Sequence, residues 1–236
     1  AGSSVLGMII PPSVMLIIYA VVTEQSVGAM FLAGVLPGVL LAVAFCLSIV
    51  LFAAFFPRFV GGVDTPAEAV PLGKLVRDAL VKLGPVLLLV VVVLGGIYGG
   101  ILTPVESGAA GTVAAALLGL AKRRLTPQAI WGALVDTGHI TANILFLIIA
   151  ASIYSRMLGI AALPTMFGEW LATLQMSFAA FMFLYVLLLL ALGTIFDTAS
   201  IILIVVPLFL PALEPLNINL VWFGIVTVVG AEIGLL

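Results

Sequence analysis

Long stretches without a charged residue dominate the chain. Four of them match or exceed the roughly 20 residues that a helix needs to cross a bilayer. They cover residues 1–23, 25–57, 83–105 and 170–196. Their lengths fit helices rather than the short alternating strands of a membrane barrel. The pattern therefore predicts an all-α, polytopic membrane protein.

Prolines, glycines and helix caps divide these stretches into shorter elements. The adjacent Pro11 and Pro12 remove two backbone donors and disfavour helix just before them, so a helix arriving through residues 5–10 should stop there. Thr103, Pro104 and Glu106 have the order of a capping box, which starts a helix. The other predicted elements, in chain order, are a helix at 14–22, a short apolar piece at 27–36 that ends at Pro37, a spanning helix at 39–56, an interfacial helix within 58–84, a spanning helix at 85–98, an alanine-rich helix that ends before Lys122, a short amphipathic piece after Thr126, a crossing at 143–154, an outer connection at 158–174, and helices at 178–192, 201–210 and 221–236.

Two interruptions inside apolar stretches are candidates for a functional site. The first runs from Gly7 to Ser13, and its alternative interpretation is a proline kink in an ordinary spanning helix. The second, residues 192–200, places Asp197 among a glycine, two threonines and a serine. Within a bilayer, non-helical backbone is tolerated where protein buries it or it lines a cavity, and carboxylates face the interior or water. Asp197 is therefore a candidate functional residue, with capping of the following helix or pairing with a buried donor as the alternative.

Composition supports the membrane assignment and excludes several functions. Of 236 residues, 64% are hydrophobic and 8% are charged, whereas about a quarter of a globular protein is charged. The net charge of −2 and the lack of a basic patch give no indication of nucleic-acid binding. Cys46 is the only cysteine, so the chain builds no disulfide and no cysteine metal site. It has no paired-aspartate, Gly-x-Ser-x-Gly or His-Glu-x-x-His motif, and an enzyme is not expected.

Two basic clusters predict the orientation in the membrane. Lys74, Arg77 and Lys82 precede one predicted crossing, and residues 122–124 follow the next. Two crossings separate the clusters, so both lie on one side. The positive-inside rule makes that side cytoplasmic.

The end of the chain resembles its beginning. Residues 230–236 repeat the composition of residues 2–9, and such repeats occur in transporters built from inverted halves. Glu232, within the second copy, is expected to pair or to extend to the membrane surface. We expect both ends to be cut from a longer protein.

Several segments together resemble the large membrane subunit of tripartite ATP-independent periplasmic (TRAP) transporters, and the resemblance covers essentially the whole chain. They are residues 7–13 with Ile17, Ile18 and Tyr19, residues 31–38, the Gly-Gly to Thr-Pro-x-Glu segment at 95–106, the glycine-to-aspartate element at 193–197, and the approach to a second Pro-Pro hairpin at 222–234. The resemblance implies an elevator-type fold with inverted repeats, re-entrant hairpins and interrupted helices, incomplete at both ends. It implies sodium-driven symport of an organic acid anion, of the dicarboxylate, sugar acid or sialic acid class, across the bacterial or archaeal inner membrane. It also implies a small membrane subunit and a periplasmic substrate-binding protein as partners, and no cofactor apart from the coupling ions.

The resemblance further implies one permease domain over residues 1–236. Its parts are the end of the first hairpin with the following helix (1–23), an arm and spanning helix (24–57), a cytoplasmic interfacial helix (58–84), central spanning helices (85–191), and the second interrupted helix with the start of the second hairpin (192–236).

The chemistry expected at the breaks is that of oxygen ligands and helix amino ends. Sodium prefers hard oxygens, which carbonyls freed from helical pairing supply, and an amino end of a half-helix can meet a substrate carboxylate. Any single hydroxyl can instead bond back to its own helix. The predicted ion- and substrate-binding residues are Gly7, Pro11, Pro12, Ser13, Gly193, Thr194, Asp197, Thr198, Ser200, Gly230 and Gly234, with Gly7, Ile10, Gly193 and Thr194 as sodium candidates.

Two alternative functions remain open from the sequence. A proton-coupled transporter of organic anions would use Asp197, and with it Glu232, as the relay. A structural membrane subunit without a transport path would tolerate changes at Asp197 and at the hydroxyls near the prolines.

Overall fold

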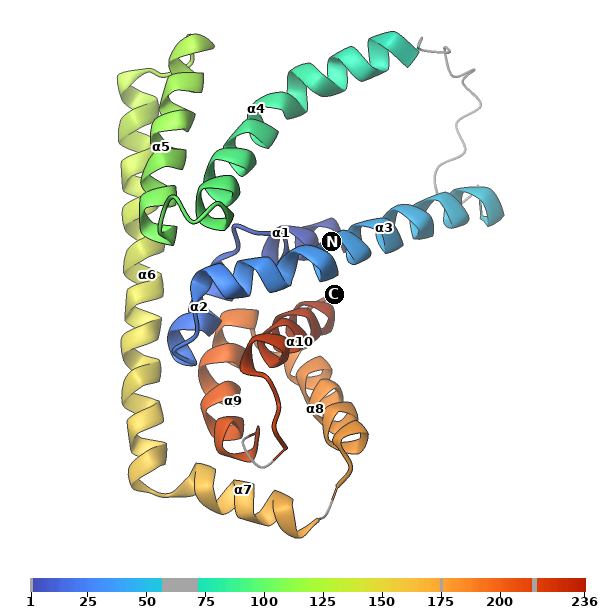
Figure 1. The fold of residues 1–236 in the computed structure, drawn as a ribbon, viewed down its shortest axis with the longest axis vertical. Helices are drawn as coiled ribbons and strands as arrows, with labels where there is room; N and C mark the ends of the chain where they lie inside the picture. Colours follow the sequence, from blue (N-terminus) through green and yellow to red (C-terminus); the bar gives the residue numbers. More distant parts are fainter. Residues whose placement is uncertain (1, 57–71, 175, 214–215) are drawn as a thin grey trace. The chain divides into compact units, whose positions relative to one another are not determined.

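The computed structural model describes residues 2–56, 72–174, 176–213 and 216–236, which form ten helices and no strand (Figure 1). The helices are α1 (Gly2–Ile9), α2 (Val14–Val22), α3 (Val27–Phe55), α4 (Leu72–Tyr98), α5 (Pro104–Ala121), α6 (Pro127–Ile160), α7 (Leu163–Thr173), α8 (Phe178–Gly193), α9 (Thr198–Leu213) and α10 (Leu220–Gly234). The predicted all-α fold is confirmed.

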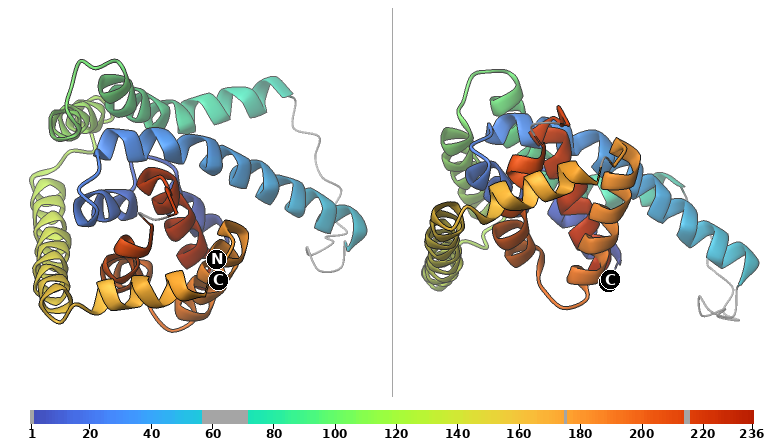
Figure 2. Two further views of the ribbon diagram at one scale, coloured as in Figure 1. Left: turned by 60° about the horizontal axis from the view of Figure 1, so that its bottom comes forward. Right: turned by 90° about the horizontal axis from the view of Figure 1, so that it is seen from below.

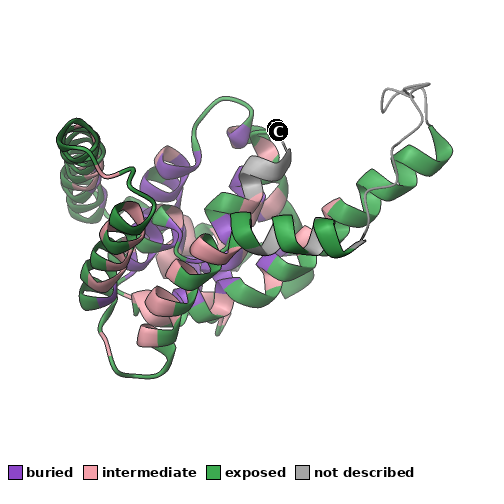
Figure 3. Cartoon of the chain, turned by 90° about the horizontal axis from the view of Figure 1, so that it is seen from above, coloured by how far each residue is buried: buried purple, intermediate pink, exposed green. Residues whose placement is uncertain are grey.

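Four of these helices are long and apolar enough to cross a membrane. They are α3, the Val81–Tyr98 part of α4, α5 and α6, and the shorter α8, α9 and α10 are also apolar. Large apolar side chains remain exposed along them, including Phe55 on α3 and Phe146 on α6, both 73% exposed. Figure 3 shows the same pattern, with exposed residues running along whole helices. Lipid is the solvent that suits such surfaces, so the chain is a multi-pass membrane protein.

Three of the predicted breaks are absent. α3 continues through Pro37, α4 continues through Pro85, and α6 joins the predicted amphipathic piece after Thr126 to the crossing at 143–154. One proline removes a single backbone donor. At Pro37 apolar sequence lies on both sides, and helix is the conformation that satisfies the remaining backbone groups in lipid. At Pro85 the preceding residues are amphipathic and the following ones apolar, so both sides again favour helix. The predicted outer connection at 158–174 is also largely helical, as the end of α6 and α7. Of the predicted interfacial helix, residues 58–71 lie outside the described residues.

The chain divides into two compact units. The second unit, Leu40–Ile130, is organised by the α4–α5 hairpin, in which a methyl group added at Gly111 would lie only 2.7 Å from Val93 Cγ2. The predicted capping box starts α5: the Glu106 carboxylate accepts from the Thr103 N–H at 2.7 Å, and the Glu106 N–H donates to the Thr103 hydroxyl at 3.3 Å. This cap is confirmed.

The first unit, Ala1–Val39 with Trp131–Leu236, contains most of the buried side chains. Its helices α2, α8, α9 and α10 lie side by side in both views of Figure 2, and α8 and α10 share the most extensive contact of the chain. At their centre the Tyr185 ring stacks on Phe223 at 4.5 Å and meets Phe209 edge-on at 5.1 Å between ring centroids. This aromatic core fixes the helices that carry the candidate site.

In this core the buried hydroxyls of Tyr185 and Thr227 form a hydrogen bond, and removing its donor or its acceptor should affect stability differently. The Thr227 hydroxyl donates to the Phe223 carbonyl at 2.8 Å, so the Tyr185 hydroxyl must be the donor in their 2.8 Å bond. Tyr185→Phe removes both the donor and its need for a partner, and should lower the free energy of unfolding by about 1 kcal/mol. Thr227→Val leaves the Tyr185 hydroxyl buried without a partner and should cost about 2 kcal/mol. Thermal unfolding of the complete permease in detergent measures both, and equal losses would contradict the assignment of donor and acceptor.

Candidate functional site

The first interruption is a true break between two helices. α1 ends at Ile9 and α2 begins at Val14, as predicted, so the alternative of a proline kink in one continuous helix is excluded. Ser13 caps α2 and is 1% exposed. Its hydroxyl donates to the Met8 carbonyl and accepts from the Leu16 N–H at 3.4 Å. One buried side chain therefore bridges the two sides of the break.

The second interruption separates α8, which ends at Gly193, from α9, which begins at Thr198. The exposed Asp197 carboxylate accepts from the Ser200 N–H at 3.1 Å and from the Ser200 hydroxyl at 2.5 Å, as a cap does. The Thr194 hydroxyl bonds back to a carbonyl of α8 at 2.7 Å. Two of the hydroxyls in this cluster thus have local partners, and Asp197 has the capping geometry given above as its alternative.

Both breaks lie toward the same end of the first unit. α2 packs against α9, and the last residue of α2, Val22, lines the same pocket as Leu213, the last residue of α9. The two helices therefore run in the same direction, and each break lies on the side away from that pocket. α10 ends beside the second break, because Gly234 contacts Gly193 at the end of α8.

A glycine pair on α3 packs over the first break. A methyl group added at Gly34 would lie 3.1 Å from the Ile9 carbonyl oxygen and 2.9 Å from Leu16 Cδ1. One added at Gly38 would lie 2.9 Å from Ile10 Cγ1. Glycines four residues apart let helices approach closely in membranes. Sequence reasoning missed this pair, although its spacing within an apolar run is the signal that could have found it.

A second glycine pair, on α10, packs beside the second break. A methyl group added at Gly234 would lie 2.8 Å from the Leu190 carbonyl oxygen and 3.0 Å from Gly193 Cα. One added at Gly230 would lie 2.9 Å from Leu189 Cδ1. The same four-residue spacing therefore recurs at both breaks, and here both glycines are among the predicted site residues.

The remaining predicted residues differ in their surroundings. Thr198 is 4% exposed and lies beside Glu232, which is 3% exposed. Glu232 therefore does not extend to the membrane surface, and its position inside an apolar helix was the signal for its burial. Pro11 is buried whereas Pro12 and Ile10 are exposed, and no atom beyond its own helix lies within 4 Å of a methyl group added at Gly7. Within the described part of the chain, no cluster of three histidine, cysteine or acidic residues could hold a metal.

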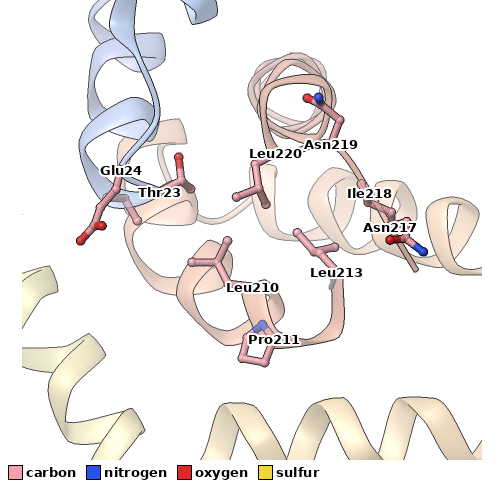
Figure 4. A pocket seen from close by; sticks show the side chains of 10 residues that line it. Thr23, Glu24, Leu210, Pro211, Leu213, Asn217, Ile218, Asn219 and Leu220 are labelled. Atoms are coloured by element: carbon pink, nitrogen blue, oxygen red, sulfur yellow. The ribbon is translucent and has the colours of Figure 1, made fainter. Parts of the chain in front are cut away.

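A pocket at the opposite end of the same unit contains none of the predicted site residues. Its volume is 780 Å³, and it lies between the end of α2, the end of α9 and the start of α10. Figure 4 shows Leu213 and Leu220 beside this space, with the Glu24 carboxylate pointing away from it. Residues 214–215, which follow Leu213 in the sequence, are outside the described residues. The candidate site therefore rests on the two breaks.

Comparison with known proteins assigns the chain to a family. Residues 1–236 match the family model "Tripartite ATP-independent periplasmic transporter, DctM component". The C4-dicarboxylate TRAP transporter large permease protein DctM of Pseudomonas aeruginosa is 34% identical over 100% of this chain and 54% of its own length. The sialic acid TRAP transporter large permease protein SiaM of Vibrio cholerae is 31% identical (100% and 54%), and the C4-dicarboxylate protein DctM of Rhodobacter capsulatus is 32% identical (99% and 55%).

The chain spans about half the length of the curated relatives it matches. These relatives are named as transporter permeases, and the family is one of transport subunits rather than enzymes. The family model covers the whole chain, and the two breaks lie within residues 7–13 and 192–200, where the prolines and the polar cluster predict them. The chain belongs to the DctM component family of the tripartite ATP-independent periplasmic transporters.

Proposed function

We propose that the complete protein is the large membrane subunit of a secondary transporter that imports an organic acid anion across the inner membrane of a bacterium or archaeon. A small membrane subunit would accompany it, and a periplasmic binding protein would deliver the substrate. The observation that carries the proposal is a pair of helix breaks in one compact unit, each followed by a helix that runs in the same direction as the other. Interrupted helices near the middle of the membrane are the usual substrate and ion sites of such carriers.

The chemistry at the breaks supports an anion as the substrate. The amino ends of α2 and α9 point in the same direction. Ser13 and Asp197 cap one N–H group each, and the remaining N–H groups of the first turns and the helix dipoles favour an anion near these ends. Two relatives are named for C4-dicarboxylates and one for sialic acid, and these compounds share a carboxylate. We therefore infer a carboxylate as the group that is recognised.

Sodium is the proposed coupling ion. The breaks free backbone carbonyls near the candidate residues Gly7, Ile10, Gly193 and Thr194, and carbonyls bind a cation without placing further charges in the membrane. Binding of the ion would order both breaks and complete the substrate site, which couples the two ligands reciprocally. Proton coupling through Asp197 is the second candidate, and the exposed carboxylate of that residue is the observation in its favour.

Uptake into liposomes tests the proposal. The complete protein is reconstituted with its small subunit and binding protein and supplied with a labelled C4-dicarboxylate or labelled sialic acid. We expect uptake to need an inward sodium gradient and to fall in Asp197→Asn. Uptake driven equally by a proton gradient alone would refute sodium coupling and favour the Asp197 relay. Full activity of Asp197→Asn, with no dependence on either gradient, would favour a structural subunit.

A further inference from the structure

One carboxyl side chain is buried among the helices that flank the breaks. α1, α2, α8, α9 and α10 contain no lysine, arginine or histidine, and Glu232 is their only acidic residue. It lies in the last turns of α10 and is 3% exposed. A carboxyl group in such apolar surroundings needs a hydrogen-bond partner, because an unpaired buried polar group is strongly unfavourable.

The available partner is Thr198, the first residue of α9. Its side chain is buried, and its hydroxyl makes no bond of ordinary hydrogen-bond length to the described residues. α9 packs against α10, and Gly234, two residues after Glu232, contacts Gly193 at the edge of the break that Thr198 ends. The two buried side chains are thereby brought close enough to interact. The other predicted hydroxyls, on Ser13, Thr194 and Ser200, already have local partners. Thr198 is thus the one that remains free to join α9 to another helix.

We propose that Glu232 is a positioning residue of the second break: its carboxyl holds the Thr198 hydroxyl and so fixes the amino end of α9 against the end of α10. The contact between Gly193 and Gly234 brings the backbones of α8 and α10 together, but it leaves α9, on the other side of the break, unrestrained. The polar pair sets the register and thereby the direction of the backbone groups at 194–197. This inference rests on the proposed function only in making the break part of a transport site.

A double-mutant cycle tests the pair in the complete permease. Cys46→Ser, with any cysteine outside this chain also replaced, allows a single probe at Ile195→Cys, because Ile195 lies in the break and is 75% exposed. The rate of labelling by a maleimide then reports the opening of the break. Thr198→Val and Glu232→Ala should each raise this rate about fivefold, and the double variant should label no faster than the faster single variant. Glu232→Gln keeps hydrogen-bonding groups and should stay within about twofold of the unsubstituted rate.

Thr227→Val is the matched control, because Thr227 is also a buried threonine but bonds Tyr185 rather than Glu232. In the double variant with Glu232→Ala, the fold-changes in labelling rate of the two single variants should multiply, as independent effects do. The proposal would be overturned if the fold-increases in labelling rate of Thr198→Val and Glu232→Ala multiply in the double variant. It would also be overturned if neither single variant changes the rate. If the variant with the cysteine probe does not fold, the same cycle is measured without the probe, from the midpoints of thermal unfolding.

The proposed function can fail while the Glu232–Thr198 pair is retained, and the reverse. The cycle is measured without sodium, so it reports the pair alone. A non-additive cycle together with sodium-independent uptake would retain the pair and refute the sodium-coupled carrier. An additive cycle together with sodium-dependent uptake would do the reverse.

Discussion

Gly193→Ala is expected to lower the free energy of unfolding of the complete permease by about 3 kcal/mol, because its new methyl group has no space. That methyl group would lie 2.7 Å from Gly234 Cα and 2.8 Å from the Ala231 carbonyl oxygen. Both are backbone atoms, so the whole end of α10 must move to relieve the clash. The displaced break should also reduce substrate uptake to the background level.

Two other glycines provide the controls for this substitution. Gly230→Ala meets only the flexible Leu189 side chain, so its loss should be about 1 kcal/mol. Gly138→Ala on α6 meets nothing within 4 Å and should be neutral or stabilising by up to about 1 kcal/mol, since alanine favours helix. Thermal unfolding and uptake are measured for all three variants. Equal stability of the Gly193→Ala and Gly138→Ala variants would show that α8 and α10 do not pack together at Gly193 as described.

Ser13→Ala should cost about 2 kcal/mol, because it removes two interactions from a buried position. The Leu16 N–H loses its cap and the Met8 carbonyl loses its donor. Ser177→Ala is the matched control: Ser177 caps α8 through the Ala180 N–H at 3.3 Å, but it is exposed and bridges no break. Its loss should stay below about 1 kcal/mol.

Thermal unfolding distinguishes the two serine variants, and uptake should fall only for Ser13→Ala. Equal destabilisation would mean that Ser13 acts as an ordinary cap and that the Met8 contact contributes nothing.

Local chemistry made the breaks predictable from sequence. Two adjacent prolines cannot continue a helix, and the polar cluster around Asp197 weakens one, so the ends of α1 and α8 and the start of α2 fell at or next to the predicted residues. α9 begins at Thr198, earlier than the predicted residue 201, because Asp197 caps it. Pro37 and Pro85 were misjudged because a single proline removes too little hydrogen bonding to end a helix when the residues on both sides favour one.

The contacts of the second break with α10 could not be predicted without the fold. Sequence separates Gly193 from Gly234, and Thr198 from Glu232, by more than thirty residues, and no local pattern indicates that they meet. Asp197 drew attention as the carboxylate of the polar cluster, whereas the structure buries Glu232 and exposes Asp197. Burial depends on which helix faces pack together, and hydrophobicity alone leaves this undetermined when a helix is apolar all round.

The central claim, that the two breaks bind a coupling sodium ion, is tested most directly by ion-dependent stability of the purified complete permease. A ligand that binds the folded state raises its stability with the logarithm of ligand concentration. Thermal unfolding is followed while sodium replaces potassium at constant ionic strength. The account predicts that the unfolding midpoint rises with sodium, and that Gly193→Ala weakens this rise. Identical midpoints in sodium and potassium would contradict it.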